Sequence, residues 1–554
     1  MIGVIAKPGQ ADIVAEFFEL FKTPWEFHQS GRSYSAVVMT ADAPAHTVNT
    51  RLVLLYGGTR ATDAACVTRH ANSRGRITIN WADLRLPLYG DVCTFLSGAE
   101  REAYVGSTAG TVGVRLTGPG TTVIRLGYDV FEEARFLLSY GQPAEHAGTP
   151  SLEAHIDMMR KWIVASGVGL VEIPPSPAGH AFTVCLTHDI DFIGIRQHLF
   201  DHSMFGFVFR SSLGSLNDLL RRRITLRRAM KMWRALGSLP AVYLGWARDF
   251  WEPFAWYLRA ERGLPATYFL IPDKHRAGER VPGRHASRRA SAYDIDDIPK
   301  WVETLRAKGC EVAVHGIDAW HSVEHGIRER ERITSAAGGV PSIGIRMHWL
   351  LSDEATAHTL EQAGYAYDST NGYNETVGFR AGTGQVFRPL GVTRLLELPL
   401  HIQDGALFYT GRLGLSESAA MMRCRAIADD VARYGGVLTV LWHDRSHGPE
   451  RFWGDFYLRL LEALKFWGAF YGTASQVVAW FERRRTVRFA VTDSGAVRLT
   501  IATGGSVPVD PPLCIRIHRA AGDCSDRRAS APVVDMPWTG EWPLDVPEQR
   551  AVAV

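Results

Sequence analysis

Short apolar runs alternate with amphipathic stretches through the middle of the chain. Six runs between residues 182 and 444 read as strands: FTVCLTHD, ATYFLIP, CEVAVHG, IGIRMHW, LLELPL and GVLTVLWHD. Between several of them lie stretches with helical spacing, such as DIPKWVETLRAKG, which starts with acids and ends in Lys-Gly as helix polarity favours. Strands that alternate with helices predict a parallel sheet with helices packed outside it. We therefore predict an α/β domain over 181–484, with its chemistry at the strand ends.

The hydrophobic pattern differs on either side of this domain. Residues 1–150 combine a helical spacing in DIVAEFFELFKTPWEF with strand-like runs such as SAVVMTA and TRLVLLYGG, which predicts a separate N-terminal α/β domain. Residues 151–180 predict an amphipathic helix and then an extended, Pro-rich linker. The alternation in RTVRFAVTDSGAVRLTIATGG predicts a hairpin that turns at DSG. We expect a small β-rich C-terminal module over 485–554.

A long insertion, at about 196–264, separates the first two strands of the central domain. It is rich in aromatic and basic residues, and we expect it to be helical. We interpret it as additional helices packed over the domain; a lid or an aromatic platform for sugars is the alternative. Its basic stretch LLRRRITLRRAMKMWRA, residues 219–235, favours a solvated helix face, and contact with a membrane surface or an anionic glycan is the alternative.

Composition narrows the class of protein. The 554 residues include 61 Lys and Arg against 58 Asp and Glu, and this near-balance predicts no nucleic-acid partner. The 7 cysteines are scattered without a CxxC pair, which argues against a disulfide framework and a structural zinc site. The first residues lack the pattern of a signal peptide, and no apolar run approaches the roughly 20 residues that span a bilayer. We expect a cytoplasmic protein with no transmembrane segment, and its oligomeric state stays open.

Charged and polar residues gather at the ends of the predicted strands. Asp189 and Asp191 end the first strand, and alternation along a strand lets both carboxylates point the same way. Two adjacent carboxylates repel each other, so both stay ionised only with a cation or a proton nearby. His315 ends a later strand, and His321 converges with it only if a loop separates them. Asp318 is either a helix cap or an alternative ligand.

Three further strand ends carry the same kinds of residue. Arg346 and His348 occupy alternate positions of IGIRMHW, Asp368 follows in YDSTNGYNETVGFRAGT, and His443 ends GVLTVLWHD. Each of these residues alone is more often structural than catalytic. Their joint placement at successive strand ends predicts one shared site.

Taken together and in this order, these motifs resemble the polysaccharide deacetylases of carbohydrate esterase family four, with the NodB-like fold. The resemblance covers roughly 180–484: LTHDID matches the paired-aspartate motif, GCEVAVHGIDAWH the histidine motif, GIRMHWLL the arginine motif, AGYAYDST the next aspartate motif, and VLTVLWHD the closing leucine-histidine motif. It implies a distorted (β/α) barrel, a divalent metal, usually zinc, and removal of N-acetyl groups from amino sugars in a carbohydrate substrate.

The resemblance also implies a role for each matched residue. Asp189 would be the general base and His443 the general acid. Asp191, His315 and His321 would be the metal ligands, although the two histidines are further apart than is usual in the family. Arg346 would orient the base through a charge-assisted contact. Asp368 would lie with Arg346 in the layer of residues around the base and the ligands. Position 188 is His where the family often has an aromatic residue, and the sequence leaves its role open.

Because no secretion signal is seen, a cytoplasmic glycan or a lipid-linked glycan precursor fits better than an extracellular wall. Three other functions stay open at this point. The first is a catalytically silent barrel that binds glycan. The second is a non-haem iron oxygenase, since two histidines and a carboxylate also suit iron. The third is a metal-dependent amidase that acts on a small amide.

Overall fold

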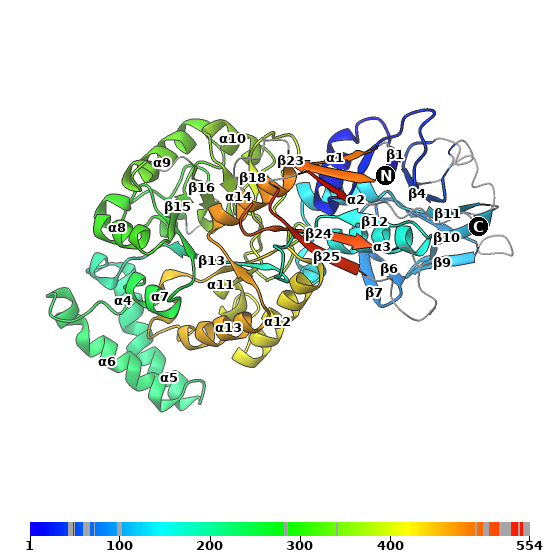
Figure 1. Ribbon diagram of the computed structural model, residues 1–554. Helices are drawn as coiled ribbons and strands as arrows, with labels where there is room; N and C mark the ends of the chain where they lie inside the picture. The colour runs from blue at the N-terminus through cyan, green and yellow to red at the C-terminus, as the bar shows by residue number, and fades with distance from the viewer. Residues whose placement is uncertain are drawn as a thin grey trace.

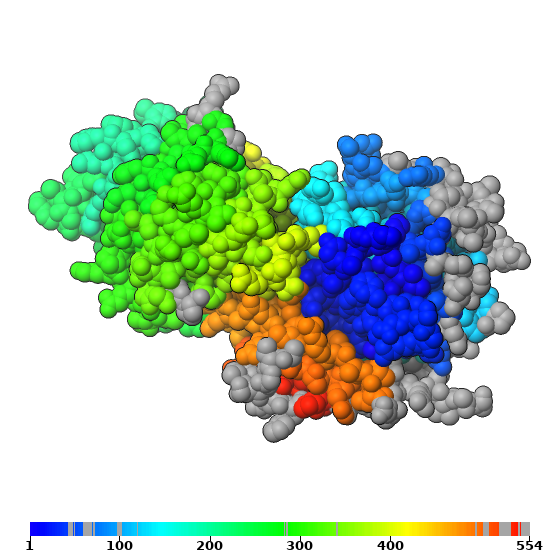
Figure 2. Space-filling view, turned by 90° about the horizontal axis from the view of Figure 1, so that it is seen from above, coloured from blue at the N-terminus to red at the C-terminus, as the bar shows by residue number. Residues whose placement is uncertain are grey.

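The computed structural model describes the chain apart from residues 43–47, 49, 59–66, 71, 97–101, 119, 282, 284–285, 340–341, 493–495, 502–508, 520–532, 541–542 and 547–554. Two bodies lie side by side in it (Figure 1), with the N-terminal sheet on one side and the central α/β domain on the other. The view from above shows the same arrangement (Figure 2), with the C-terminal strands beside the N-terminal body. Among the described residues, no helix combines the length and the apolar composition needed to cross a bilayer.

The N-terminal body is built on a mixed sheet of 11 strands. Five strands on one side run parallel, in the order β2-β1-β3-β4-β11, and the others pair in antiparallel fashion. The strands are β1 (Ile2–Ile5), β2 (Trp25–Phe27), β3 (Ala36–Met39), β4 (Leu52–Leu55), β5 (Val67–His70), β6 (Ile77–Trp81), β7 (Leu84–Leu88), β8 (Val92–Phe95), β9 (Glu102–Ser107), β10 (Gly110–Gly118) and β11 (Thr121–Leu126).

Three helices pack against this sheet: α1 (Ala11–Phe21), α2 (Val130–Ser139) and α3 (Ser151–Ala165). Asp129 precedes α2, and its carboxylate accepts hydrogen bonds from the free amides of Phe131 and Glu132, which fixes where that helix begins. The apolar residues of all three helices share one core with those of the sheet. A short 3₁₀ turn (Ala144–His146) lies between α2 and α3.

The central domain is built on a parallel sheet of 9 strands in the order β18-β17-β16-β15-β14-β13-β20-β19, with β21 beside β13. Every pairing in it is parallel. The strands are β13 (Thr183–Ile190), β14 (Ala266–Leu270), β15 (Glu311–Gly316), β16 (Gly344–Met347), β17 (Tyr367–Asp368), β18 (Leu396–Glu397), β19 (Ile402–Gln403), β20 (Val437–Leu441) and β21 (Phe470–Tyr471). The predicted α/β class with a distorted barrel is confirmed.

Helices surround this sheet on the outside (Figure 1). They are α7 (Phe254–Ala260), α8 (Pro299–Ala307), α9 (Val323–Ala336), α10 (Thr356–Ala363), α11 (Asp404–Phe408), α12 (Glu417–Tyr434), α13 (Gly454–Phe466) and α14 (Ala474–Arg485). Every residue of β13 is buried, as expected of a central parallel strand that is covered on both faces. Thr473 and Gln476 form a capping box that starts α14.

Within 196–264 the chain forms a helical hairpin that projects away from the N-terminal body (Figures 1 and 2). Its helices are α4 (His202–Phe209), a π-helical turn (Arg210–Gly214), α5 (Ser215–Leu220) and α6 (Leu226–Tyr243). Only part of it packs on the barrel, through a small core that includes Ile195, Phe207 and Trp251.

Two small antiparallel sheets complete the fold. One joins β22 (Val487–Val491), β23 (Val497–Ile501) and β26 (Leu544–Val546). The other joins β24 (Leu513–His518) and β25 (Val533–Trp538) to β12 (Leu170–Glu172), which comes from the stretch before the Pro-rich linker. The hairpin β22–β23 is antiparallel as predicted, whereas its turn at 493–495 lies outside the described residues.

A buried arginine connects the N-terminal body, the linker that follows it and the barrel. Arg484, on α14, donates hydrogen bonds to the carbonyl oxygens of Leu20 and Ile173 and to the side chain of Gln385. Burial lowers the pKa of its guanidinium to about 10, so it keeps its charge at neutral pH. Since a carbonyl dipole stabilises a buried cation, this contact fixes the N-terminal body against the barrel.

Candidate metal and catalytic site

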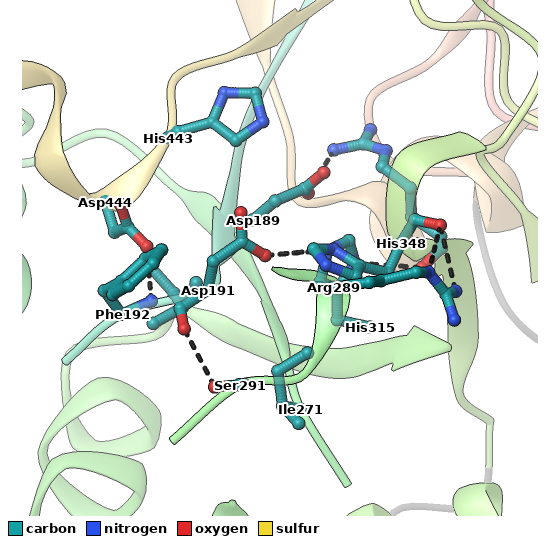
Figure 3. A network of polar contacts seen from close by, with 12 residues as sticks. Asp189, Asp191, Phe192, Ile271, Arg289, Ser291, His315, His348, His443 and Asp444 are labelled. Carbon is teal, nitrogen blue, oxygen red and sulfur yellow. Dashed lines mark hydrogen bonds and ion pairs between the residues drawn. The ribbon is translucent and has the colours of Figure 1, made fainter. Parts of the chain in front are cut away.

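Four of the predicted site residues lie at the carboxyl ends of parallel strands (Figure 3): Asp189, Asp191, His315 and His443. Asp189 belongs to β13 and Asp191 follows it. His315 belongs to β15, where it pairs with Arg346 of β16, and His443 follows β20 by two residues. Parallel strands present their carboxyl ends at one edge of a sheet, so residues far apart in sequence meet there. A Cβ at Gly316 would lie 2.5 Å from Met347 Sδ, so this glycine lets β15 and β16 pack closely beside the site.

Three side chains converge at this edge with the geometry of a metal site. They are Asp191, His315 and His348, whose possible ligand atoms all lie within 4.8 Å of one another. Asp191 Oδ1 is 3.3 Å from His315 Nε2 and 3.0 Å from His348 Nδ1, and the two ring nitrogens are 2.8 Å apart. One carboxylate and two imidazoles form a ligand set that suits zinc or non-haem iron.

The hydrogen bonds around His315 fit this ligand set. Its Nδ1 lies 3.0 Å from the Arg346 carbonyl oxygen, which can only accept, so we assign the proton of the neutral ring to Nδ1. Nε2 then carries a lone pair and points at an Asp191 oxygen that is buried and makes no hydrogen bond. Two acceptors that face each other need a cation between them, and the backbone contact holds the ring in the tautomer that binds metal.

The charge states of Asp191 and His348 also suit metal binding. Burial favours a neutral carboxyl, yet His348 and His315 hold the pKa of Asp191 well below its ordinary value, so it is ionised. Burial lowers the pKa of His348, which keeps its imidazole neutral. A ligand must present a lone pair, and both residues do so at neutral pH.

A second carboxylate, Asp189, lies beside the three converging residues. Arg346 Nη1 donates to Asp189 Oδ1 at 2.9 Å and to the Thr187 hydroxyl at 2.8 Å. Arg346 is itself fully buried, and its guanidinium lies over the Phe269 ring. A buried arginine that is held on several sides fixes the orientation of its carboxylate partner.

His443 faces Asp189 and Asp191 from the side opposite His315 and His348 (Figure 3). Its Nδ1 lies 2.5 Å from Asp404 Oδ1, and its backbone amide donates to Asp404 Oδ2 at 2.9 Å. Burial alone would lower the pKa of His443, but Asp404 raises it to about 9, with smaller contributions from Asp189 and Asp191. The ring is therefore protonated at neutral pH. Because Nδ1 faces Asp404, the proton that it can give up is on Nε2.

Asp368 lies beside a residue that Arg346 contacts. The arginine donates to the backbone oxygen and the hydroxyl of the next residue, Ser369. The Asp368 carboxylate accepts a hydrogen bond from the Thr370 amide, and burial raises its pKa to about 6. Its place in the layer around the base stays a prediction.

The structure does not bring His321 to Asp191 and His315. Its Nε2 lies 3.2 Å from Asp318 Oδ1, in a neighbouring cluster. In that cluster Glu279, Asp318 and His325 also place possible ligand atoms within 4.8 Å. However, the Arg276 guanidinium lies 3.9 Å from Asp318 and 4.0 Å from Glu279, so a cation already compensates these carboxylates. The position expected for His321 beside Asp191 is held by His348.

His188 points to the opposite face of β13 from Asp189, as alternation along the strand requires. Its Nδ1 lies 2.9 Å from the Trp442 carbonyl oxygen and its Nε2 2.8 Å from Glu261 Oε1. The ring is fully buried and lies 3.9 Å from the centre of the Tyr257 ring. His188 therefore packs beneath the site and does not line it.

Sequence reasoning gave His348 no role as a metal ligand and missed Asp404 as a site residue. The alternation of Arg346 and His348 was the available signal for the first, because alternate positions of a strand share a face. After His348 the chain turns sharply, with positive φ at Trp349 (65°) and Leu350 (53°), and this turn sets where the ring lies. Asp404 follows a strand of only two residues, too short to produce a recognisable pattern.

No protein-family model and no curated protein matches the chain. Among solved structures, it is similar to a putative polysaccharide deacetylase from Mycobacterium smegmatis, with 17% identity, a TM-score of 0.33, and coverage of 56% of this chain and 95% of that one. It is also similar to a probable polysaccharide deacetylase from Pseudomonas aeruginosa PAO1 (13% identity, TM-score 0.33, 55% and 93% coverage) and to Puue allantoinase (12%, 0.32, 55% and 92%).

The structures to which the chain is similar thus include polysaccharide deacetylases, as its sequence motifs predict. At these identities and TM-scores the matches carry no weight for the activity or the substrate of this chain. Residue roles therefore depend on the contacts at the strand ends.

Proposed function

We propose that this chain is a metal-dependent hydrolase that removes N-acetyl groups from an amino-sugar-containing glycan or glycan precursor. The observation that carries the proposal is the convergence of Asp191, His315 and His348 between two opposed groups. On one side lies a carboxylate, Asp189, that forms an ion pair with a buried arginine; on the other lies a protonated histidine, His443. Hydrolysis of an amide needs these parts together, because the carbonyl is unreactive and the amine is a poor leaving group.

In this proposal Asp191, His315 and His348 hold the metal, which is zinc, and His348 takes the place that the sequence motif gave to His321. A divalent metal bound there lowers the pKa of a coordinated water and polarises a carbonyl oxygen. Metal identity is part of the proposal, since the same ligand set also suits iron.

The protein's own side chains would then move the two protons. Asp189 accepts the proton of the attacking water at a carboxylate oxygen, and Arg346 orients it for that step. His443 donates its Nε2 proton to the leaving amine, while Asp404 stabilises the imidazolium and fixes the ring. Asp368 supports this arrangement indirectly, through the segment that carries Ser369.

The proposal is tested by acetate release from N-acetylglucosamine oligosaccharides, using zinc-loaded protein and an Asp189→Asn control. We expect acetate and a free amine to form in equal amounts with the wild-type protein and almost none with the variant. Metal binding without acetate release, but with hydrolysis of a small cyclic or linear amide, would favour the amidase alternative. Absence of metal binding would favour the silent glycan-binding barrel.

A further inference from the structure

The helical hairpin α4–α6 carries an unusual share of the exposed apolar surface. Among the described residues, 23 large hydrophobic side chains are exposed, and 12 of them lie between residues 199 and 246. Scattered exposed hydrophobics are normal on a protein surface, but a contiguous group marks a surface that contacts something apolar. The hairpin projects from the barrel (Figures 1 and 2), so this surface is not covered by the rest of the chain.

The first arm of the hairpin, residues 202–220, has its polarity partly inverted. Its buried positions include the small hydroxyls Ser203, Ser211 and Ser215. Its exposed positions carry larger apolar residues: Phe205, Phe209, Leu213, Leu216 and Leu220. Leu220 is 76% exposed, and the other four are between 45% and 65% exposed. A helix that faced only water on that side would show the opposite pattern. The outward face of this arm therefore suits an apolar surrounding.

The second arm, α6, carries two adjacent stripes at helical spacing. One stripe is exposed and apolar: Leu226, Met230 and Trp233. The next stripe, displaced by one residue and hence by about 100° around the axis, is exposed and basic: Arg227, Lys231 and Arg234. Trp233 Nε1 donates to Ser215 Oγ at 2.9 Å, which joins this arm to the first. A basic stripe beside an apolar one is the pattern of helices that lie in a membrane interface.

Charge in this region is concentrated and only partly paired. Residues 196–250 contain ten basic and three acidic side chains, a net charge of +7, whereas the whole chain carries +3. Arg228 pairs with Glu417, and Arg210 with Glu450. Among the residues that the structure describes, Arg221, Arg222, Arg227 and Arg234 form no ion pair. Unpaired guanidinium groups at the end of a projecting hairpin suit an extended anionic surface.

We infer that the α4–α6 hairpin binds the surface of an anionic lipid bilayer. Its exposed Phe, Leu and Trp side chains enter the headgroup boundary, and the arginines contact lipid phosphates. A second copy of the chain fits this surface less well, since symmetric contact would bring two surfaces of charge +7 together. The hairpin lies on the surface and does not span the bilayer, in keeping with the absence of a spanning helix among the described residues.

The hairpin begins close to the candidate site. Asp191 directly follows β13, and the chain enters the insertion at Ile195 and Arg196. If the hairpin holds the bilayer on the same side of the barrel as the strand ends, a glycan linked to a lipid could reach the metal ligands. This last consequence rests on the proposed function, whereas binding of the hairpin to lipid does not.

The inference is tested by flotation of the full chain with phosphatidylcholine vesicles, with and without phosphatidylglycerol. We expect the wild-type chain to float with the anionic vesicles, much less with the neutral ones, and less as salt is raised. Replacing the basic stripe (Arg227→Gln, Lys231→Gln and Arg234→Gln together) should weaken binding by roughly a hundredfold, since each basic residue near an anionic surface contributes about a fivefold factor.

A second variant tests the exposed apolar residues of the first arm, and a third serves as a matched control. Phe209→Ser with Leu213→Ser and Leu220→Ser should reduce binding by at least about tenfold without lowering the melting temperature. Lys300→Gln with Arg306→Gln and Lys308→Gln, at exposed positions on and just after α8, should leave binding unchanged. Equal binding by all variants, no binding to anionic vesicles at low salt, or a concentration-dependent dimer that the serine variant abolishes would each overturn the inference. Because none of these readouts uses activity, they stand apart from any failure to detect deacetylation.

Discussion

Two clusters of histidines and carboxylates lie close together in the barrel, and only one of them has the surroundings of a catalytic site. In the first, Asp191 meets His315 and His348; in the second, Asp318 meets His321, while His325 meets Glu279. Each cluster contains a buried carboxylate oxygen without a hydrogen bond, at Asp191 Oδ1 and Asp318 Oδ2. Residue types alone therefore do not separate them.

The two clusters differ in the groups that face the buried carboxylate. Around Asp191, two imidazole nitrogens converge, and the hydrogen bond of His315 to a backbone carbonyl leaves a lone pair toward the centre. Around Asp318, the Arg276 guanidinium already supplies positive charge at 3.9 Å. The first arrangement needs a cation and the second has one, so we assign the metal to the first.

The largest expected effect comes from removing a ligand of the first cluster. His315→Ala should abolish metal binding and lower the rate of acetate release by a thousandfold or more, on the order of what several kcal/mol of lost transition-state stabilisation implies. His325→Ala, in the second cluster, is the matched control and should retain both metal and activity. Metal analysis of the two purified variants, followed by acetate assays, checks this prediction.

The next largest effect is expected from a variant that loses activity but keeps its metal. Asp189→Asn removes the proton acceptor but no ligand, so we expect a loss of activity of about 10²–10⁴-fold with full metal content. The variant keeps the shape of the side chain and one acceptor for Arg346, so it should fold normally. If Asp189→Asn lost metal together with activity, Asp189 would have to be counted among the ligands.

A pH profile tests the opposite side of the site. Asp404 raises the pKa of His443 to about 9, and the proposed acid must be protonated, so activity should fall as the pH rises through about 9. Asp404→Asn removes the charge that raises this pKa, so the alkaline limb should move down toward the ordinary histidine value of about 6.5. Profiles of kcat against pH for the two proteins, at saturating substrate, measure the shift. An unchanged alkaline limb would exclude His443 as the acid.

The smallest effect on activity is expected from a change at His188, which packs beneath the site. His188→Phe removes the contacts to Glu261 and to the Trp442 carbonyl, which leaves a buried carboxylate without one of its partners. We expect a loss of about 1–3 kcal/mol in the free energy of unfolding, with kcat nearly unchanged. Urea unfolding and acetate assays of the same preparation measure both quantities. A large fall in kcat at unchanged stability would instead give His188 a catalytic role.

The sequence was sufficient for the fold class and for the edge of the sheet at which the site lies. Apolar runs that end in Asp189, His315, Arg346 and His443 predict a parallel sheet, and parallel strands place such residues together. These signals are local in sequence and are set by strand period and strand order. No knowledge of the three-dimensional path of the loops was needed for them.

The third ligand and the partner of the acid depend on contacts that spacing does not encode. His321 follows His315 closely in sequence, but the intervening loop turns it toward Asp318. His348 comes from the next strand and reaches Asp191 because the chain turns at Trp349. Asp404 reaches His443 from a strand of two residues. In each case the decisive feature is a loop conformation that the tertiary structure sets.

Metal content of three purified proteins tests the central claim most directly: the wild-type chain, His348→Ala and His321→Ala, each supplied with zinc and then dialysed. We predict about one equivalent of zinc in the wild-type protein, almost none in His348→Ala, and the wild-type amount in His321→Ala. Loss of zinc in His321→Ala with retention in His348→Ala would contradict the assignment and return the metal to the second cluster.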